Sequence, residues 1–105
     1  MSKLEKIKEL SILFDLYQNI LTDIQKNIFI MYFLEDKSLS EIADYQNTSR
    51  TSISDSLKKS EQKLLSIEQK LGFAKIRQKL DRLILSLEQK GERKISSQLN
   101  SILNK

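Results

Sequence analysis

Residues 38–59 read SLSEIADYQNTSRTSISDSLKK, and this stretch predicts two helices joined by a short turn. Ser38 and Glu41 form a capping box, in which the serine oxygen accepts one free N–H and the glutamate reaches back to another. This arrangement places the start of the first helix at Leu39. The apolar side chains of that helix then fall on a single face, which consists of Leu39, Ile42 and Ala43.

The turn and the second helix follow from the next residues. Asn47 tolerates the left-handed backbone conformation that a turn without glycine requires. Ser49 is a suitable N-cap for the second helix, and Ile53 and Leu57 form its inward stripe. The remaining side chains of this helix are expected to face outward, namely Arg50, Thr51, Ser52, Ser54, Asp55, Lys58 and Lys59.

Two interpretations of this stretch remain open: a nucleic-acid-binding helix-turn-helix and a plain structural helix pair. The first is favoured, because recognition helices present short polar and basic side chains near their N-termini. Asp55 repels phosphate unless a lysine pairs with it. The predicted nucleic-acid contacts are Arg50, Lys58 and Lys59 for phosphates or base edges, and Thr51, Ser52 and Ser54 for short hydrogen bonds.

The composition predicts a small all-α bundle. The 105 residues suit one domain, 1–105, and the hydrophobic content of 39% is enough for a core. Two glycines and no proline leave too few turn residues for an all-β protein. We therefore expect a multi-helix bundle with a helix-turn-helix at 38–59 and a C-terminal helical extension at 60–105.

Several functional classes are disfavoured by what the sequence lacks. It has no cysteine and no histidine, the commonest metal ligands and general bases, and no glycine-rich phosphate loop. We therefore expect no enzymatic activity, catalytic residue, cofactor or metal site. No apolar run approaches the roughly 20 residues of a membrane span, and the first residues are charged, so we expect a cytoplasmic protein without membrane insertion.

The net charge of +4 is unevenly distributed. Residues 1–48 carry 5 basic and 8 acidic side chains, whereas residues 49–105 carry 13 basic and 6 acidic ones. The basic half begins at the proposed recognition helix, which suits an anionic partner. A lysine-rich face that is merely solvated is the alternative explanation.

Apolar spacing and capping residues predict the other helices. Ser2 and Glu5 open a first helix over residues 3–21, and Thr22 and Gln25 open a second that includes the apolar run 28–34. That run could also be a buried strand, but the capping box and the lack of a pairing strand favour helix. A long helix over 50–71 ends before Gly72, a fifth ends at Gly91, and a short sixth follows.

The fifth helix carries a coiled-coil-like seam with two interpretations. It could fold back within the chain or pack against the same seam of a second copy, and a homodimer is favoured because the apolar surface is generous for one small bundle. A two-fold axis would then present two recognition helices about 34 Å apart. The seam consists of Phe73, Ile76, Leu80, Leu83 and Leu87.

Two family resemblances cover most of the chain. Leu21-Thr22-Asp23-Ile24-Gln25, with Ser38-Leu39-Ser40-Glu41-Ile42-Ala43 and Ser49-Arg50, resembles the promoter-reading C-terminal domain of bacterial sigma factors. The wider match, with Leu13-Phe14-Asp15-Leu16-Tyr17-Gln18 ahead of it and Asp55 after it, resembles the YlxM family of helix-turn-helix proteins. Gln46, Thr48, Ser52 and Ser54 depart from that family's usual residues.

The YlxM resemblance implies a dimeric, cytoplasmic, all-helical accessory or regulatory protein of the signal recognition particle pathway, because genes of that family lie beside the gene for the particle's GTPase. Its partner would be nucleic acid, either DNA or the particle's RNA. The alternative function is a protein-interaction module, in which the helix-turn-helix is only scaffold and the helices after Gly72 bind the signal recognition particle GTPase.

Overall fold

The computed structural model describes residues 2–104, and every regular element in this range is a helix. This confirms the predicted all-α class. The chain divides into two compact units, one ending at Leu71 and one beginning at Gly72. The prediction that residues 1–105 form a single domain stays a prediction. The elements are α1 (Lys3–Tyr17), η1 (Gln18–Ile20), α2 (Asp23–Phe29), η2 (Ile30–Leu34), α3 (Leu39–Tyr45), α4 (Arg50–Leu71), α5 (Phe73–Gln89) and α6 (Arg93–Leu103).

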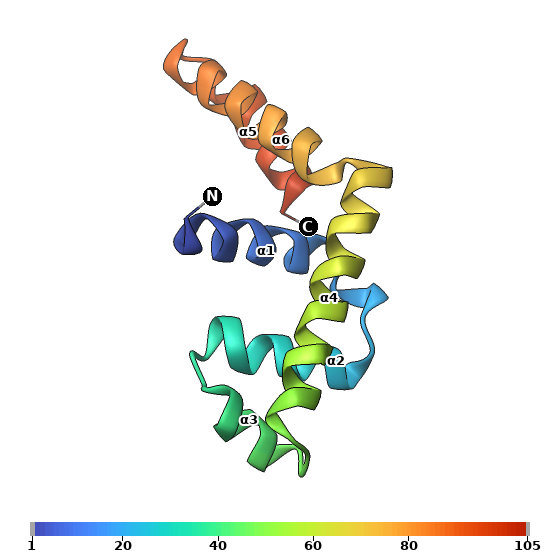
Figure 1. Cartoon of the computed structure of the whole chain (residues 1–105). Helices are drawn as coiled ribbons and strands as arrows, with labels where there is room; N and C mark the ends of the chain where they lie inside the picture. The colour runs from blue at the N-terminus through green and yellow to red at the C-terminus, as the bar shows by residue number, and fades with distance from the viewer. Residues whose placement is uncertain (1, 105) are drawn as a thin grey trace. The chain divides into compact units, whose positions relative to one another are not determined.

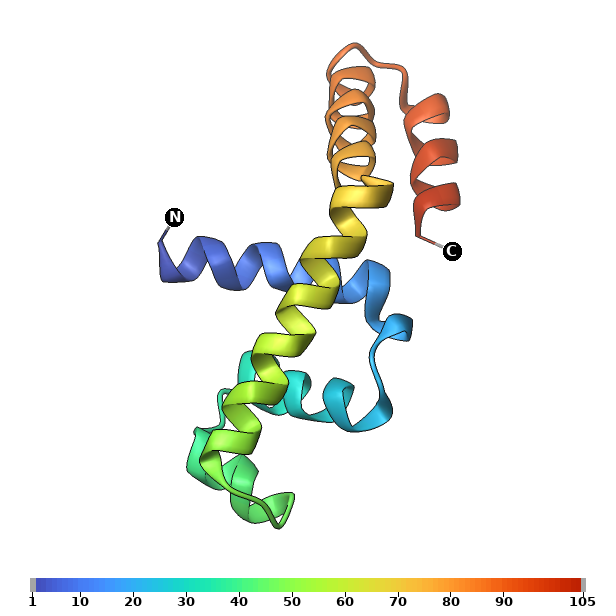
Figure 2. The same ribbon diagram turned by 45° about the vertical axis from the view of Figure 1, so that its right-hand side comes forward.

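The first unit is built around α4, which contacts α1, α2 and α3 in turn (Figures 1 and 2). The 22 residues of α4 span about 33 Å at ~1.5 Å per residue. Its buried side chains lie at spacings of three and four residues, so that one stripe of the helix serves all three neighbours. These buried residues are Ile53, Leu57, Ser60 and Leu64.

Aromatic rings join α1 to α2 in the core of this unit. The rings of Phe14 and Phe29 are stacked, with centroids 4.5 Å apart, and Phe33 lies 4.6 Å from Phe29 in a tilted arrangement. Phe29 is fully buried. Stacking of this kind adds to the free energy of burying the rings, so α1 and α2 are held in a fixed register.

The predicted caps of the first helices are largely present. Thr22 and Gln25 form the predicted capping box, with N···O distances of 3.0 and 3.1 Å. Ser2 accepts the N–H of Glu5 at 3.2 Å, which is one half of the box predicted there. The first α-helix is shorter than predicted, because it ends at Tyr17 and a 3-10 turn continues the chain.

The apolar run 28–34 is helical, as predicted, but it changes helix type within the run. The N–H of Glu35 donates to the carbonyl of Ile30 at 2.9 Å, which is the i to i−5 bond of a π-helix. Asp36 then adopts a left-handed conformation with φ of 55°. This wider last turn and the left-handed residue direct the chain into α3.

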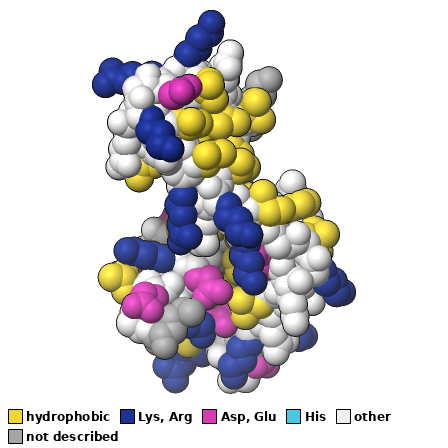
Figure 3. Space-filling model, turned by 90° about the horizontal axis from the view of Figure 1, so that it is seen from above, with side chains coloured by type: hydrophobic (Ala, Val, Ile, Leu, Met, Phe, Trp, Pro, Cys, Tyr) yellow, Lys and Arg dark blue, Asp and Glu magenta, His cyan; other side chains and the backbone are white. Residues whose placement is uncertain are grey.

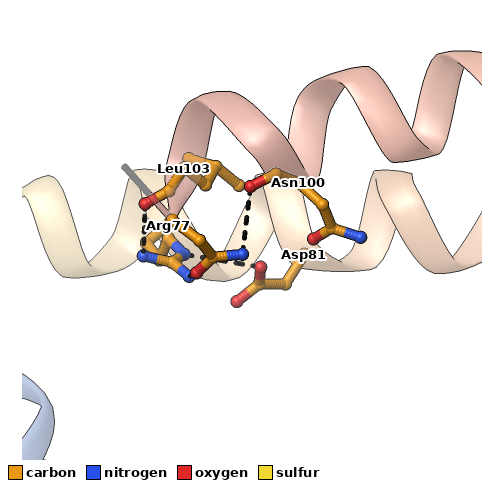
Figure 4. Close-up of polar contacts among 5 residues, drawn as sticks. Arg77, Asp81, Asn100 and Leu103 are labelled. Carbon is orange, nitrogen blue, oxygen red and sulfur yellow. Dashed lines mark hydrogen bonds and ion pairs between the residues drawn. The ribbon is translucent and has the colours of Figure 1, made fainter.

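The second unit is a hairpin of α5 and α6. Gly91 has φ of 82° at the turn, and the N–H of Glu92 donates to the carbonyl of Leu87 at 2.8 Å to close α5. Arg77 on α5 ties the helices together at their other end (Figure 4). Its guanidinium donates to the Leu103 carbonyl at 3.4 Å and to the Asn104 side-chain oxygen at 2.9 Å.

Much of the predicted seam of α5 is accessible to solvent. Ile76 and Leu83 are 51% and 49% exposed, whereas Ile84 is buried. Consecutive helical residues point about 100° apart, so Ile84 and Leu83 occupy different faces of α5. The space-filling view also shows exposed hydrophobic side chains gathered in patches beside lysine and arginine side chains (Figure 3).

Candidate nucleic-acid interface

The helix-turn-helix starts from the predicted capping box at α3. The Ser38 oxygen accepts the Glu41 N–H at 3.1 Å, and the Glu41 carboxylate accepts the Ser38 N–H at 3.2 Å. These hydrogen bonds from Ser38 favour the charged carboxylate, and they lower the pKa of Glu41 from its usual 4.5. The box therefore fixes the first turn of α3 and the direction from which the chain enters it.

The turn between α3 and α4 is a Schellman motif centred on Asn47. The N–H of Thr48 donates to the Ala43 carbonyl at 3.0 Å, and the N–H of Asn47 donates to the Asp44 carbonyl at 3.3 Å. Asn47 has φ of 56°, which confirms the predicted left-handed residue. The motif ends α3 and sends the chain directly to Ser49.

Ser49 caps α4, as predicted. Its side-chain oxygen accepts the N–H of Ser52 at 3.1 Å, and its carbonyl accepts the N–H of Ile53 at 3.2 Å. Ile53 and Leu57 are buried in a cluster that joins α4 to α3 and to the α2–η2 segment. That cluster contains Ile28, Met31, Ile42, Ala43, Ile53 and Leu57.

The predicted site residues of α4 are exposed, with one partial exception. Ser54 is only partly exposed, so its hydroxyl is less accessible than predicted. Asp55 is exposed on the same helix and adds one negative charge to an otherwise neutral and basic surface. The exposed predicted residues are Arg50, Thr51, Ser52, Lys58 and Lys59.

The basic members of this set are not neutralised by acidic partners. Within residues 2–104, ion pairs are formed by Lys6, Lys37 and Arg77, and none involves Arg50, Lys58 or Lys59. Their charges are therefore available to an anion. The exposed residues therefore lie in two stretches of α4, its first turn and its third, with the second turn between them.

Sequence reasoning missed two further basic residues of α4, Lys63 and Lys70. Both are exposed. Lys63 follows Lys59 by four residues and Lys70 follows Lys63 by seven, which places all three on one flank of the helix. That spacing was present in the sequence. The orientation of the flank relative to α2 becomes visible only in the structure.

Other kinds of site are not found in the described part of the chain. Residues 2–104 contain no group of three or more acidic, histidine or cysteine side chains that could hold a metal ion. None of the helices in this range is both long and apolar enough to cross a membrane.

Comparison with known proteins identifies the family. Residues 4–102 match the model of UPF0122, described as "Putative helix-turn-helix protein, YlxM / p13 like". The chain belongs to the UPF0122 family. A UPF0122 protein of Mycoplasma capricolum is 47% identical over 85 residues, which cover 81% of this chain and 75% of that protein. A UPF0122 protein of Listeria monocytogenes is 42% identical over 84 residues, covering 80% and 76%.

The UPF0122 match confirms the YlxM resemblance and extends it. The matched range includes the whole of α3, the turn and α4, and it continues through α5 into α6. The helix-turn-helix in the family's description corresponds to the α3–turn–α4 geometry described above. The residues of α5 and most of those of α6 therefore lie within the range that the family model matches.

Proposed function

We propose that this UPF0122 protein is a non-enzymatic regulatory or accessory protein that binds nucleic acid through the exposed side of the first three turns of α4. The single observation that carries the proposal is the α3–turn–α4 arrangement with Arg50, Lys58 and Lys59 exposed and outside every ion pair in residues 2–104. Arg50 and the two lysines contact phosphates or base edges, and Thr51, Ser52 and Ser54 supply short hydrogen bonds.

The geometry supports this assignment through the division of α4 into two sides. Ile53 and Leu57 hold α4 against α3, so the helix is fixed without help from its outer residues. The outer residues near the helix start are short, apart from Arg50, and allow the backbone to approach a groove closely. This is how helix-turn-helix proteins position a recognition helix.

The proposal is tested by the salt dependence of binding to a DNA duplex. Replacing Arg50 and Lys58 by alanine removes two phosphate contacts, so the slope of log K against log salt should flatten by about 1.8. A control with Lys3 and Lys8 of α1 replaced by alanine loses the same charge elsewhere and should keep the wild-type slope. If both variants change the slope equally, binding reflects net charge and not this surface.

The proposed biological setting is the signal recognition particle pathway, as the YlxM resemblance implies, and the proposed location is the cytoplasm. The target is either DNA or the particle's RNA. A gel-shift comparison at one fixed salt concentration should use the particle's RNA, promoter DNA of the protein's own operon and a random duplex. The preferred target should bind at least tenfold more tightly than the random duplex, and equal binding of all three would argue against a specific target.

A second candidate function is supported by the exposed seam of α5. With Ile76 and Leu83 about half exposed, this face suits an apolar partner, either a second copy of the chain or the signal recognition particle GTPase. We favour the homodimer, because the seam repeats at the spacing that pairs two identical helices. In the alternative, the seam binds the GTPase and the helix-turn-helix serves as scaffold.

Replacing Ile76 and Leu83 by serine distinguishes these occupants. If the seam pairs two copies, sedimentation should show a dimer for the wild type and a monomer for the variant. If the seam binds the GTPase, the wild type should be monomeric alone, and the variant should lose GTPase binding. Replacing exposed Leu4 of α1 by serine is the control, and it should change neither result.

A further inference from the structure

One flank of α4 carries a row of three lysines, Lys59, Lys63 and Lys70. Of these, only Lys59 belongs to the site described above. These residues are four and seven positions apart, which corresponds to about 6 and 10 Å along the helix axis. All three are exposed. They line a groove of about 700 Å³, which we call the lysine groove, together with Ile20, Gln25, Gln62, Ser66 and Ile67.

The lysine groove is formed within the first unit by α4 and the η1–α2 corner. The ammonium of Lys63 donates to the side-chain oxygen of Gln25 at 3.0 Å, and the same oxygen accepts the N–H of Thr22 in the capping box. Lys26 of α2 donates to the side chain of Asn19 at 3.4 Å. These partners are neutral, so they orient the lysines near α2 without cancelling their charge.

The acidic residues in the same part of α4 are engaged on its other flank. Glu61 pairs with Lys6 of α1 at 3.4 Å, and Glu68 accepts a hydrogen bond from the Tyr17 hydroxyl at 2.7 Å. No ion pair involves Lys59, Lys63 or Lys70 in the range 2–104. This part of the helix therefore separates its charges, with the carboxylates of Glu61 and Glu68 toward α1 and Lys63 toward α2.

The distance from the start of α4 limits what that partner can be. Lys63 and Lys70 follow Arg50 by 13 and 20 residues, or about 20 and 30 Å along the axis. The major groove of a DNA duplex is only about 12 Å wide. A major groove that receives the first turns of α4 therefore does not extend to Lys63 or Lys70, and bending a duplex toward them costs energy.

We propose that the lysine groove docks a second backbone segment of the nucleic acid whose first segment meets the start of α4, so that the preferred ligand is a folded RNA with two adjoining stems. This inference rests on the proposed function and deepens it. A folded RNA presents two backbones without a bending cost. Phosphate and 2′-hydroxyl contacts dominate such recognition, and the lysines with Gln62 and Ser66 supply suitable donors and acceptors.

The test compares two RNA probes across a salt titration: two stems joined at a bend, and one straight duplex of the same total length. Replacing Lys63 and Lys70 by alanine should flatten the salt slope on the bent probe by about 1.4 to 1.8, one contact for each lysine. The slope on the straight probe should not change. The matched control replaces the same lysines by arginine, which keeps the charge and should keep the wild-type slope on both probes.

The remaining outcomes overturn the inference in distinguishable ways. If the Lys63 and Lys70 alanine variant keeps the wild-type slope on the bent probe, the groove does not bind a backbone. If the Arg50 and Lys58 alanine variant still flattens the slope in that case, the proposed function stands without this inference. Equal flattening on both probes means that the groove binds RNA without requiring a second segment. If the wild type binds neither these RNAs nor a DNA duplex, the proposed function fails and this inference fails with it.

Discussion

At the scale of single residues, Ser60 is an unusual member of the α4 core. It is buried at 1% exposure, and its hydroxyl has no hydrogen-bond partner in the described part of the chain. A serine is small enough for helices to approach closely at this point, but an unsatisfied buried hydroxyl costs about 1 to 3 kcal/mol. The close packing at Ser60 therefore raises the free energy of unfolding, whereas its unpaired hydroxyl lowers it.

Replacing Ser60 by alanine should raise the free energy of unfolding by about 1 kcal/mol, because alanine keeps the small size and removes the unpaired hydroxyl. Urea unfolding measures this difference. Replacing exposed Ser66 by alanine is the control and should change the free energy by less than about 0.5 kcal/mol. A loss of stability for the Ser60 variant would mean that its hydroxyl does have a partner in solution.

Glu41 links the stability of the helix-turn-helix to pH. Its folded-state pKa lies below the usual 4.5, chiefly because its carboxylate accepts the backbone N–H of Ser38. A lowered folded pKa gives stability that is present above the unfolded pKa and is lost as the pH falls through the folded value. This contribution should therefore begin to decline as the pH falls through about 4.5 and should be lost below the folded pKa.

The pH effect is measured by comparing wild type with the Glu41→Gln variant in urea at several pH values. Glutamine can still accept the Ser38 N–H but has no charge, so the stability advantage of wild type should be constant near pH 7 and should shrink as the pH falls below about 4.5. An advantage that stays constant down to pH 3 would contradict the lowered pKa.

At the scale of elements, the helix boundaries that depend on local chemistry could be predicted from sequence. The boxes at Thr22 and Ser38 and the left-handed Asn47 involve residues close together in the chain, and the structure has all three. The π-helical turn at Ile30–Leu34 could not be predicted, because it depends on how Met31 and Phe33 pack against other helices. The early end of α1 at Tyr17 likewise has no marker in the sequence.

In the candidate site, too, some features follow from the local sequence and others depend on how the helices pack. The inward stripe of Ile53 and Leu57 predicts the outward residues of α4, and most of them are exposed. The partial burial of Ser54 was not predicted. The lysine groove could also be recognised only in the structure. There Glu61 pairs with Lys6 and Glu68 accepts a hydrogen bond from Tyr17, which shows that the opposite flank of α4 is the basic one.

The turn between α3 and α4 gives a prediction at this scale. Replacing Asn47 by alanine should lower the free energy of unfolding by about 1 kcal/mol, because alanine tolerates the left-handed conformation less well than asparagine. Replacement by glycine, which adopts this conformation freely, should be close to neutral. Thermal unfolding of the two variants measures the difference. Equal destabilisation by both would mean that the asparagine side chain, and not the backbone conformation, matters here.

At the scale of the whole molecule, the first unit should depend on its aromatic core. Phe29 is fully buried and contacts Phe14 and Phe33, so replacing it by alanine should cost about 3 to 5 kcal/mol. Urea unfolding followed by circular dichroism measures the loss. Replacing Ile24, which is 63% exposed on α2, should change stability by less than about 0.5 kcal/mol. A small loss for Phe29→Ala would mean that the stacked rings contribute little.

The most direct test of the central claim is to follow backbone amide signals of the full chain by NMR while a DNA duplex or RNA is added. If the start of α4 meets the nucleic acid, the largest shifts should fall between Arg50 and Lys59, with further shifts at Lys63 and Lys70 only for a folded RNA. Shifts confined to residues 72–104, or no shifts with either ligand, would contradict the assignment of α4 as a nucleic-acid-binding helix.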